Sequence, residues 1–196
     1  MKKKRKKLND NSNKILLIVE NSEVIFFNYY FKDFLKNKYN INIKCESSGR
    51  AGKCDIANGS KISKRVIEAL KNDRFKSVIL MIDLKSKCKS SDRTHTCLKK
   101  LKNEYLPKYK IPTELKDKFY LFVVCNEIES WFLTAFDKQT NNPSQNHKNE
   151  MKKLLNLSSE VAIVQKMVND LRNNKLKLNC NKNNSLKFFI DKLRMI

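Results

Sequence analysis

The stretch Ile15-Leu16-Leu17-Ile18-Val19-Glu20 decides the fold, because it is an apolar run that ends in a carboxylate. The same pattern occurs twice more, where residues 78–82 precede Asp83 and residues 120–125 precede Asn126 and Glu127. Short apolar, β-branched runs are typical of strands buried on both faces of a parallel sheet. Ligands of open α/β sheets bind at the carboxyl ends of the strands. The sequence therefore predicts that three strand ends bring carboxylates to one site.

Helical patterns between these runs predict an α/β fold with a roughly four-stranded parallel sheet flanked by helices. Apolar residues recur with helical spacing after Ser22, which we expect to cap that helix, and residues 41–45 alternate as a strand does. Further helices are expected near residues 62–70, 97–106, 127–136, 150–156, 159–173 and 184–194.

Three segments follow from this pattern. Residues 1–13 are rich in lysine and are expected to form a disordered basic tail. Residues 14–137 hold the alternating strands and helices of the core, and residues 138–196 are expected to form a helical C-terminal extension that packs on it. Trp131 is expected to anchor the core, whereas His95 and His147 fall in polar stretches and are expected at the surface.

The net charge of +22 in 196 residues favours a polyanionic partner, because such a field attracts nucleic acid over long distances. A biased, lysine-rich surface without a nucleic-acid partner is the competing interpretation. No apolar stretch is long enough to span a membrane, and no apolar segment follows the basic start. We therefore expect a cytoplasmic protein with reduced cysteines and no membrane contact.

Carboxylates that meet at one place repel one another unless a cation neutralises them, and hard oxygen ligands suit Mg²⁺ or Mn²⁺. The candidate metal ligands are Glu20, Asp83, Glu127 and Glu129. Glu23 is a weaker candidate. The structural alternative is that the glutamates merely begin helices, where acidic side chains complement the helix dipole. Glu127 and Glu129 can reach one ion only if the helix begins between or after them.

A glycine-containing segment at residues 49–59 could bring backbone close to a phosphate group. Arg50 and Lys53 within it, and Lys85 and Lys87 after the strand that ends near Asp83, are the candidate phosphate-binding residues. The segment lacks the spacing of a P-loop, because Cys54 follows Gly52-Lys53. An ordinary strand-to-helix loop is the alternative.

Several of these motifs resemble those of Toprim domains. Val19-Glu20-Asn21-Ser22-Glu23 followed by Phe26-Phe27 is similar to the family's opening motif, and Ile82-Asp83-Leu84-Lys85 stands where the family has Asp-x-Asp. Asn126-Glu127-Ile128-Glu129-Ser130-Trp131 resembles a signature of the RloB-like Toprim proteins of bacterial anti-phage defence loci. The pattern Ser185-x-x-x-Phe189 is also similar. The likeness covers about residues 14–190.

This resemblance implies a metal-dependent nuclease that cleaves phosphodiester bonds of RNA, with transfer RNA as one candidate, or of DNA. Asp83 would hold Mg²⁺ or Mn²⁺ together with Glu127, Glu129 or both. Glu20 would be a further ligand or the general base. An ATPase partner and a homo-oligomer are also implied.

Lys85 departs from the family pattern, because it replaces the second aspartate of Asp-x-Asp. Its ammonium group would either replace part of the metal's charge or repel the ion. The alternative function is therefore a non-catalytic basic subunit that binds nucleic acid or assembles with an ATPase. Retention of four carboxylates favours the nuclease, and Lys85 favours the binding subunit.

Overall fold

A computed structural model describes residues 13–48, 60–84, 106–125, 127–142 and 145–196. Its centre is a four-stranded sheet, in which every strand is parallel to its neighbours. The strands are β1 (Ile15–Val19), β2 (Ile43–Ser47), β3 (Ser77–Leu84) and β4 (Phe119–Cys125), arranged in the order β2-β1-β3-β4. The predicted α/β fold with a parallel sheet is confirmed, and its form is consistent with a Toprim-like architecture.

The strand order places a topological switch between β1 and β3. The chain passes from β1 to β2 on one side and later returns to β3 on the other side of β1. In open α/β sheets, ligands bind in the crevice that this reversal opens at the carboxyl ends of the strands. Glu20 follows β1 directly, and Asp83 is the second-last residue of β3.

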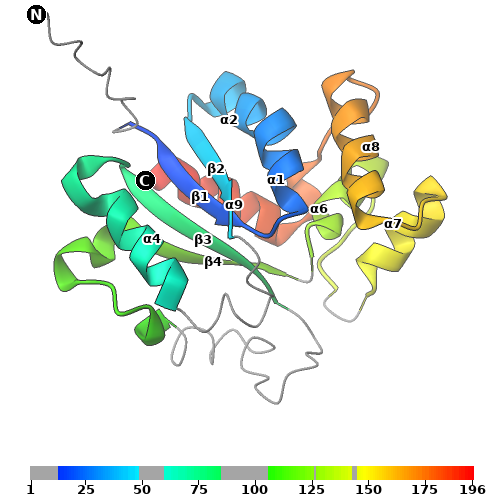
Figure 1. The fold of residues 1–196 in the computed structure, drawn as a ribbon. Coiled ribbons are helices and arrows are strands. Elements are labelled where there is room, and N and C mark those ends of the chain that lie inside the picture. The colour runs from blue at the N-terminus through cyan, green and yellow to red at the C-terminus, as the bar shows by residue number, and fades with distance from the viewer. Residues whose placement is uncertain (1–12, 49–59, 85–105, 126, 143–144) are drawn as a thin grey trace, which may run out of the picture.

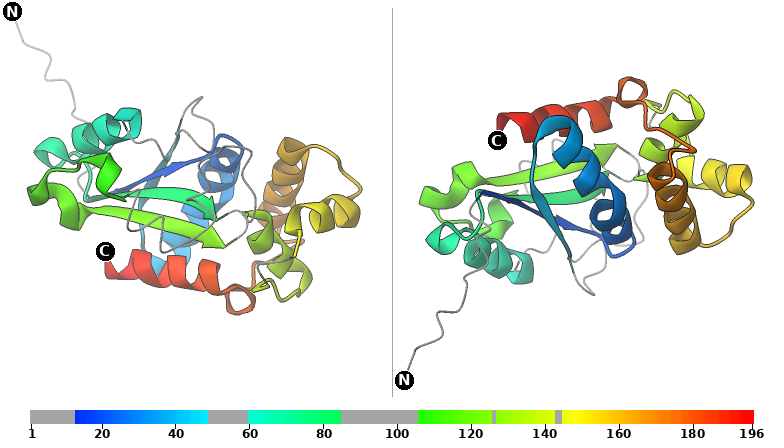
Figure 2. Two further views of the ribbon diagram at one scale, coloured as in Figure 1. Left: turned by 90° about the horizontal axis from the view of Figure 1, so that it is seen from below. Right: turned by 90° about the horizontal axis from the view of Figure 1, so that it is seen from above.

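Helices cover both faces of the sheet (Figure 1). One face packs against α1 (Glu23–Phe26), the π-helix η1 (Phe27–Phe31), α2 (Lys32–Tyr39) and α9 (Asn184–Met195), and α8 (Glu160–Arg172) packs against α1 and η1. The opposite face packs against α4 (Ser60–Leu70) and the short 3₁₀ helices η2 (Lys71–Asp73), η5 (Leu106–Tyr109) and η6 (Thr113–Lys118). Figure 2 shows α4 and α9 on opposite sides of the sheet.

The remaining elements stand beyond the carboxyl ends of the strands (Figures 1 and 2). They are α6 (Glu129–Leu133), η7 (Thr134–Phe136) and α7 (His147–Leu155), while η8 (Cys180–Lys182) leads into α9. The helix expected at residues 127–136 thus begins at Glu129 and tightens into a 3₁₀ turn at Thr134. The three helices expected after residue 149 are confirmed, with the first beginning at His147.

The C-terminal helices contribute to the central core. A single apolar cluster joins the β1 and β4 side chains Leu17 and Phe122 to Met167 of α8 and Phe189 of α9. The segment 138–196 therefore buries the same face of the sheet that α1 and α2 cover.

Of the predicted basic tail, residues 1–12 lie outside the described residues, as does most of the helix expected at 97–106.

A buried polar network fixes where α9 begins. The Asn183 side chain accepts hydrogen bonds from the Leu186 backbone N–H at 2.8 Å and the Ser185 hydroxyl at 2.7 Å. Its amide donates to the hydroxyl oxygens of Ser130 at 3.2 Å and Thr140 at 2.7 Å. Asn183 is thus both the N-cap of α9 and a link to α6.

No helix in the described part of the chain is long and apolar enough to cross a membrane.

Candidate functional site

The turn after β1 is held by two glutamates. The Glu20 backbone N–H donates to Glu23 Oε2 at 3.2 Å, and the Glu23 N–H donates to the Glu20 carbonyl at 3.2 Å. The Glu23 carboxylate thereby reaches back to a backbone donor just after β1, two residues before the N-cap Ser22. Ser22 is the N-cap residue, as predicted, but its side chain makes no capping hydrogen bond. Its backbone is already helical, which takes its hydroxyl away from the cap geometry.

Glu23 is buried, and it lies close to the core-facing Cys45 of β2. Burial raises the pKa of the Cys45 thiol well above its usual value, and the negative charges of Glu23 and Glu46 raise it further. Cys45 is therefore a protonated, inert thiol at neutral pH. Glu20, in contrast, is only half-buried and stands at the carboxyl edge of the sheet.

Arg65 of α4 binds the end of β2. Its Nη1 donates to the Ser47 carbonyl at 2.7 Å, and its Nη2 lies 3.1 Å from Glu46 Oε2. Burial alone would raise the pKa of Glu46, but hydrogen bonds from Lys44 and Arg65 outweigh it and lower the pKa. Sequence analysis did not single out Arg65, because one arginine within an amphipathic helix gives no indication that it crosses to a strand end.

Asp83 lies near the end of β3, where its Cα pairs with that of Val124 in β4. The register places Asp83 at the carboxyl ends of the strands, the same end of the sheet as Glu20 and the residues after β4. The candidate phosphate-binding residues lie outside the described residues, and they are Arg50, Lys53, Lys85 and Lys87.

Glu129 is the first residue of α6, and its carboxyl group is buried, with 5% of the residue exposed. Burial raises the pKa of Glu129, and the charges of Glu127 and Glu160 raise it further, against an opposing effect of Lys148. The buried carboxyl group of Glu129 therefore interacts with those of the half-buried Glu127 and the exposed Glu160. Because α6 begins between Glu127 and Glu129, the condition under which both could reach one ion is met.

Two later helices complete this acidic cluster. Lys148 of α7 forms an ion pair with Glu160 of α8, and both charges act on Glu129. Figure 1 shows α6, α7 and α8 gathered beyond the strand ends. Their part in the site was not predicted, because it depends on how α7 and α8 pack against α6.

The prediction that His147 lies in a polar surface loop is wrong. His147 is the first residue of α7 and only 1% exposed, because the following helix turns it inward beside α6. Burial lowers its pKa below 6.5, while the charges of Glu150 and Glu127 act in the opposite direction. His147 is therefore a neighbour of Glu127 and part of the surroundings of the acidic cluster.

Burial of neutral His147 predicts a loss of stability in mild acid. Its pKa is lower in the folded than in the unfolded state, so the unfolded chain takes up the proton first as the pH falls below about 6.5. The free energy of unfolding should therefore decrease from about pH 7.5 to about pH 5.5. Urea unfolding at both pH values should show a smaller decrease for His147→Gln; an equal decrease in both proteins would contradict the assignment.

The donor atoms at this edge suit a hard cation, since they are carboxylate oxygens with an excess of negative charge. Within the residues whose side chains are described, however, no group of three or more His, Cys, Asp or Glu side chains could hold a metal ion. The side chain of Asp83 is not among these described side chains.

No protein-family model matches the chain, and no significant match is found among curated proteins or solved structures.

Proposed function

We propose that this chain is a metal-dependent nuclease of the Toprim type, acting on RNA or DNA. The observation that carries the proposal is the placement of acidic residues at the carboxyl ends of three strands. These residues are Glu20 after β1, Asp83 in β3, and Glu127 and Glu129 after β4. Two of these strands flank the topological switch, where α/β sheets bind their ligands. The net charge of +22 supports a polyanionic substrate.

In the proposed reaction, water attacks the phosphorus atom of a phosphodiester, the P–O bond to one ribose or deoxyribose oxygen breaks, and that oxygen takes up a proton from solvent. Glu20 is half-buried at the strand end and takes the proton from the attacking water. Asp83, Glu127 and Glu129 would hold Mg²⁺ or Mn²⁺, which stabilises the charge that develops on the phosphate. Arg65 and Glu23 keep the ends of β2 and β1 in place around this edge.

A role in anti-phage defence, an ATPase partner, transfer RNA as the substrate, homo-oligomerisation and a cytoplasmic location are further parts of the proposal. The cytoplasmic location rests on the lack of a long apolar stretch in the sequence, and the other parts rest on the resemblance of the motifs at Glu20, Asp83 and Glu127 to Toprim proteins.

The second candidate is a non-catalytic nucleic-acid-binding subunit. Lys85 replaces the second aspartate of the Toprim pattern, and Lys148 already supplies a cation beside Glu129. Both observations reduce the need for a metal ion at this edge.

Incubation of the purified protein with total RNA and plasmid DNA tests the two candidates. The nuclease predicts cleavage with Mg²⁺ or Mn²⁺ that stops when EDTA is added. The binding subunit predicts a salt-sensitive gel shift of intact nucleic acid under all of these conditions. Absence of metal-dependent cleavage, both for the protein alone and with an ATPase added, would overturn the nuclease.

A further inference from the structure

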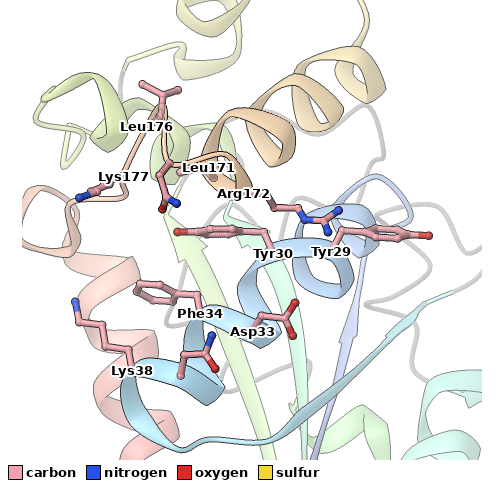
Figure 3. A pocket seen from close by; sticks show the side chains of 11 residues that line it. Tyr29, Tyr30, Asp33, Phe34, Lys38, Leu171, Arg172, Leu176 and Lys177 are labelled. Carbon is pink, nitrogen blue, oxygen red and sulfur yellow. The ribbon is translucent and has the colours of Figure 1, made fainter.

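A second region of interest is a hollow between the helix that follows β1 and the end of α8 (Figure 3). It has a volume of about 570 Å³, within the usual range of ligand sites. Its floor comes from η1 and α2, and its rim from α8 and the residues up to Lys177. These segments are removed from the acidic residues at the strand ends, so the hollow is a separate site.

Aromatic rings form one wall of this hollow. Tyr29 is 59% exposed, so its ring is accessible to a ligand in the hollow. Tyr30 and Phe34 stack on each other with ring centroids 5.9 Å apart and an interplanar angle of 21°. Burial raises the pKa of Tyr30 to about 12, with a smaller effect of Cys180, so its hydroxyl keeps its proton and can donate a hydrogen bond.

A π-helical turn places these rings in the hollow. Residues Phe27–Phe31 form η1, in which backbone hydrogen bonds span five residues where those of an α-helix span four. Phe27 and Phe31 thereby point into the core, while Tyr29 and Tyr30 lie on the side of the hollow. π-Helical turns are rare, energetically poor and frequent at functional sites, so this one is independent support for a binding role.

Positive charge surrounds the rings. Lys38 and Lys177 lie on one side of Phe34 and Tyr30, and Arg172 extends between Tyr30 and Tyr29 on the other (Figure 3). The ammonium group of Lys38 is 5.4 Å from the centroid of the Phe34 ring. Among the described residues that line the hollow, Asp33 is the one acidic side chain, and Lys38, Arg172 and Lys177 are the cations.

We propose that this hollow binds an unpaired nucleotide of a single-stranded nucleic acid. The base stacks on the tyrosine rings, as bases do on aromatic platforms of single-strand-binding proteins. The neighbouring phosphates are bound on the side of Lys38 and Lys177, away from Asp33, whose carboxylate would repel them. Asp33 instead accepts hydrogen bonds from a sugar hydroxyl or a base amino group. The inference shares nucleic acid with the proposed function but does not require cleavage.

Fluorescence anisotropy of a labelled oligonucleotide of about ten nucleotides tests this proposal, with single-stranded oligo-uridine and a duplex of equal length as the probes. The full chain is used in EDTA, so that failure of the nuclease proposal leaves the result intact. Tyr29→Ala should weaken binding of the single strand by about 5- to 100-fold, because one stacking platform is lost. Lys177→Gln should weaken it and reduce the salt dependence by about one phosphate contact.

Two matched variants serve as controls. Phe188→Ala removes an aromatic ring of similar exposure from α9, and Arg74→Gln removes one positive charge on the α4 side of the sheet. Both should bind the single strand within about twofold of the unmodified protein. The proposal is overturned if Tyr29→Ala binds as Phe188→Ala does, or if it loses duplex and single-strand binding equally, because the hollow would then not select unpaired bases. Thermal unfolding of each variant checks that the fold is kept.

Discussion

Glu20→Gln and Asp83→Asn should each reduce metal-dependent cleavage by about 100-fold or more, while nucleic-acid binding in EDTA stays close to that of the unmodified protein. Each substitution keeps the shape of the side chain and removes one negative charge at the carboxyl edge. Loss of the general base removes proton acceptance from water, and loss of Asp83 removes a charged ligand for the ion. Cleavage rates at saturating Mg²⁺ and Mn²⁺ measure both effects.

Matched controls lie near the amino ends of the strands, at the end of the sheet opposite to the proposed site. Glu114 and Asp117 are exposed residues of η6, which leads into the amino end of β4. Glu114→Gln and Asp117→Asn therefore make the same chemical changes far from the proposed site, and their cleavage rates should be unchanged. If all four variants cleave alike, the activity belongs to another site or to a contaminating nuclease. If Glu20→Gln and Asp83→Asn lose binding as well as cleavage, both substitutions have disturbed the fold.

Trp131→Ala should destabilise the protein by about 3–5 kcal/mol, since it removes a large, fully buried side chain from the main core. The indole lies between rings of two other segments, η1 and α9, with centroid distances of 5.4 Å to Phe189, 5.9 Å to Phe31 and 6.3 Å to Phe27. Its Nε1 also donates to the Ser185 hydroxyl at 2.9 Å. The predicted role of Trp131 as a core anchor is thus confirmed.

Urea unfolding followed by circular dichroism measures this loss. Trp131→Phe should cost less than Trp131→Ala, because it keeps an aromatic ring and gives up the hydrogen bond to Ser185. Phe188→Ala is the control for an exposed aromatic residue and should change the free energy of unfolding by about 0.5 kcal/mol or less. A Trp131→Ala value as small as that of Phe188→Ala would contradict the packing described here.

The sheet could be predicted from the sequence because each of its central strands is a continuous apolar run. Such runs occur where both faces are covered, as they are for β1 and β3. The edge strand β2 was less well predicted, since it begins at Ile43 where the alternating pattern suggested residue 41. Ile41 is buried although it precedes the strand, so its apolar character gave no indication of the boundary.

The surroundings of the acidic cluster could not be predicted in the same way. Glu127 and Glu129 were identified because they follow a strand, which is a local pattern. The burial of His147 and the charges of Lys148 and Glu160 depend on the packing of α7 and α8 against α6, for which a polar connecting segment gives no local pattern. The role of Arg65 could not be predicted either, because its partners are in a strand distant in the sequence.

The position of α9 also determines when the protein can finish folding during synthesis. All four strands precede residue 126, so the sheet can assemble while α9 is still inside the ribosome. Trp131 and the rings around it stay uncovered until Phe189 and the Asn183 network arrive. Because Trp131 lies two residues after Glu129, the acidic edge gains its final support only at that stage. A ribosome-bound chain would thus expose an aromatic surface that chaperones can bind. Its acidic residues at the strand ends would not yet have their final support.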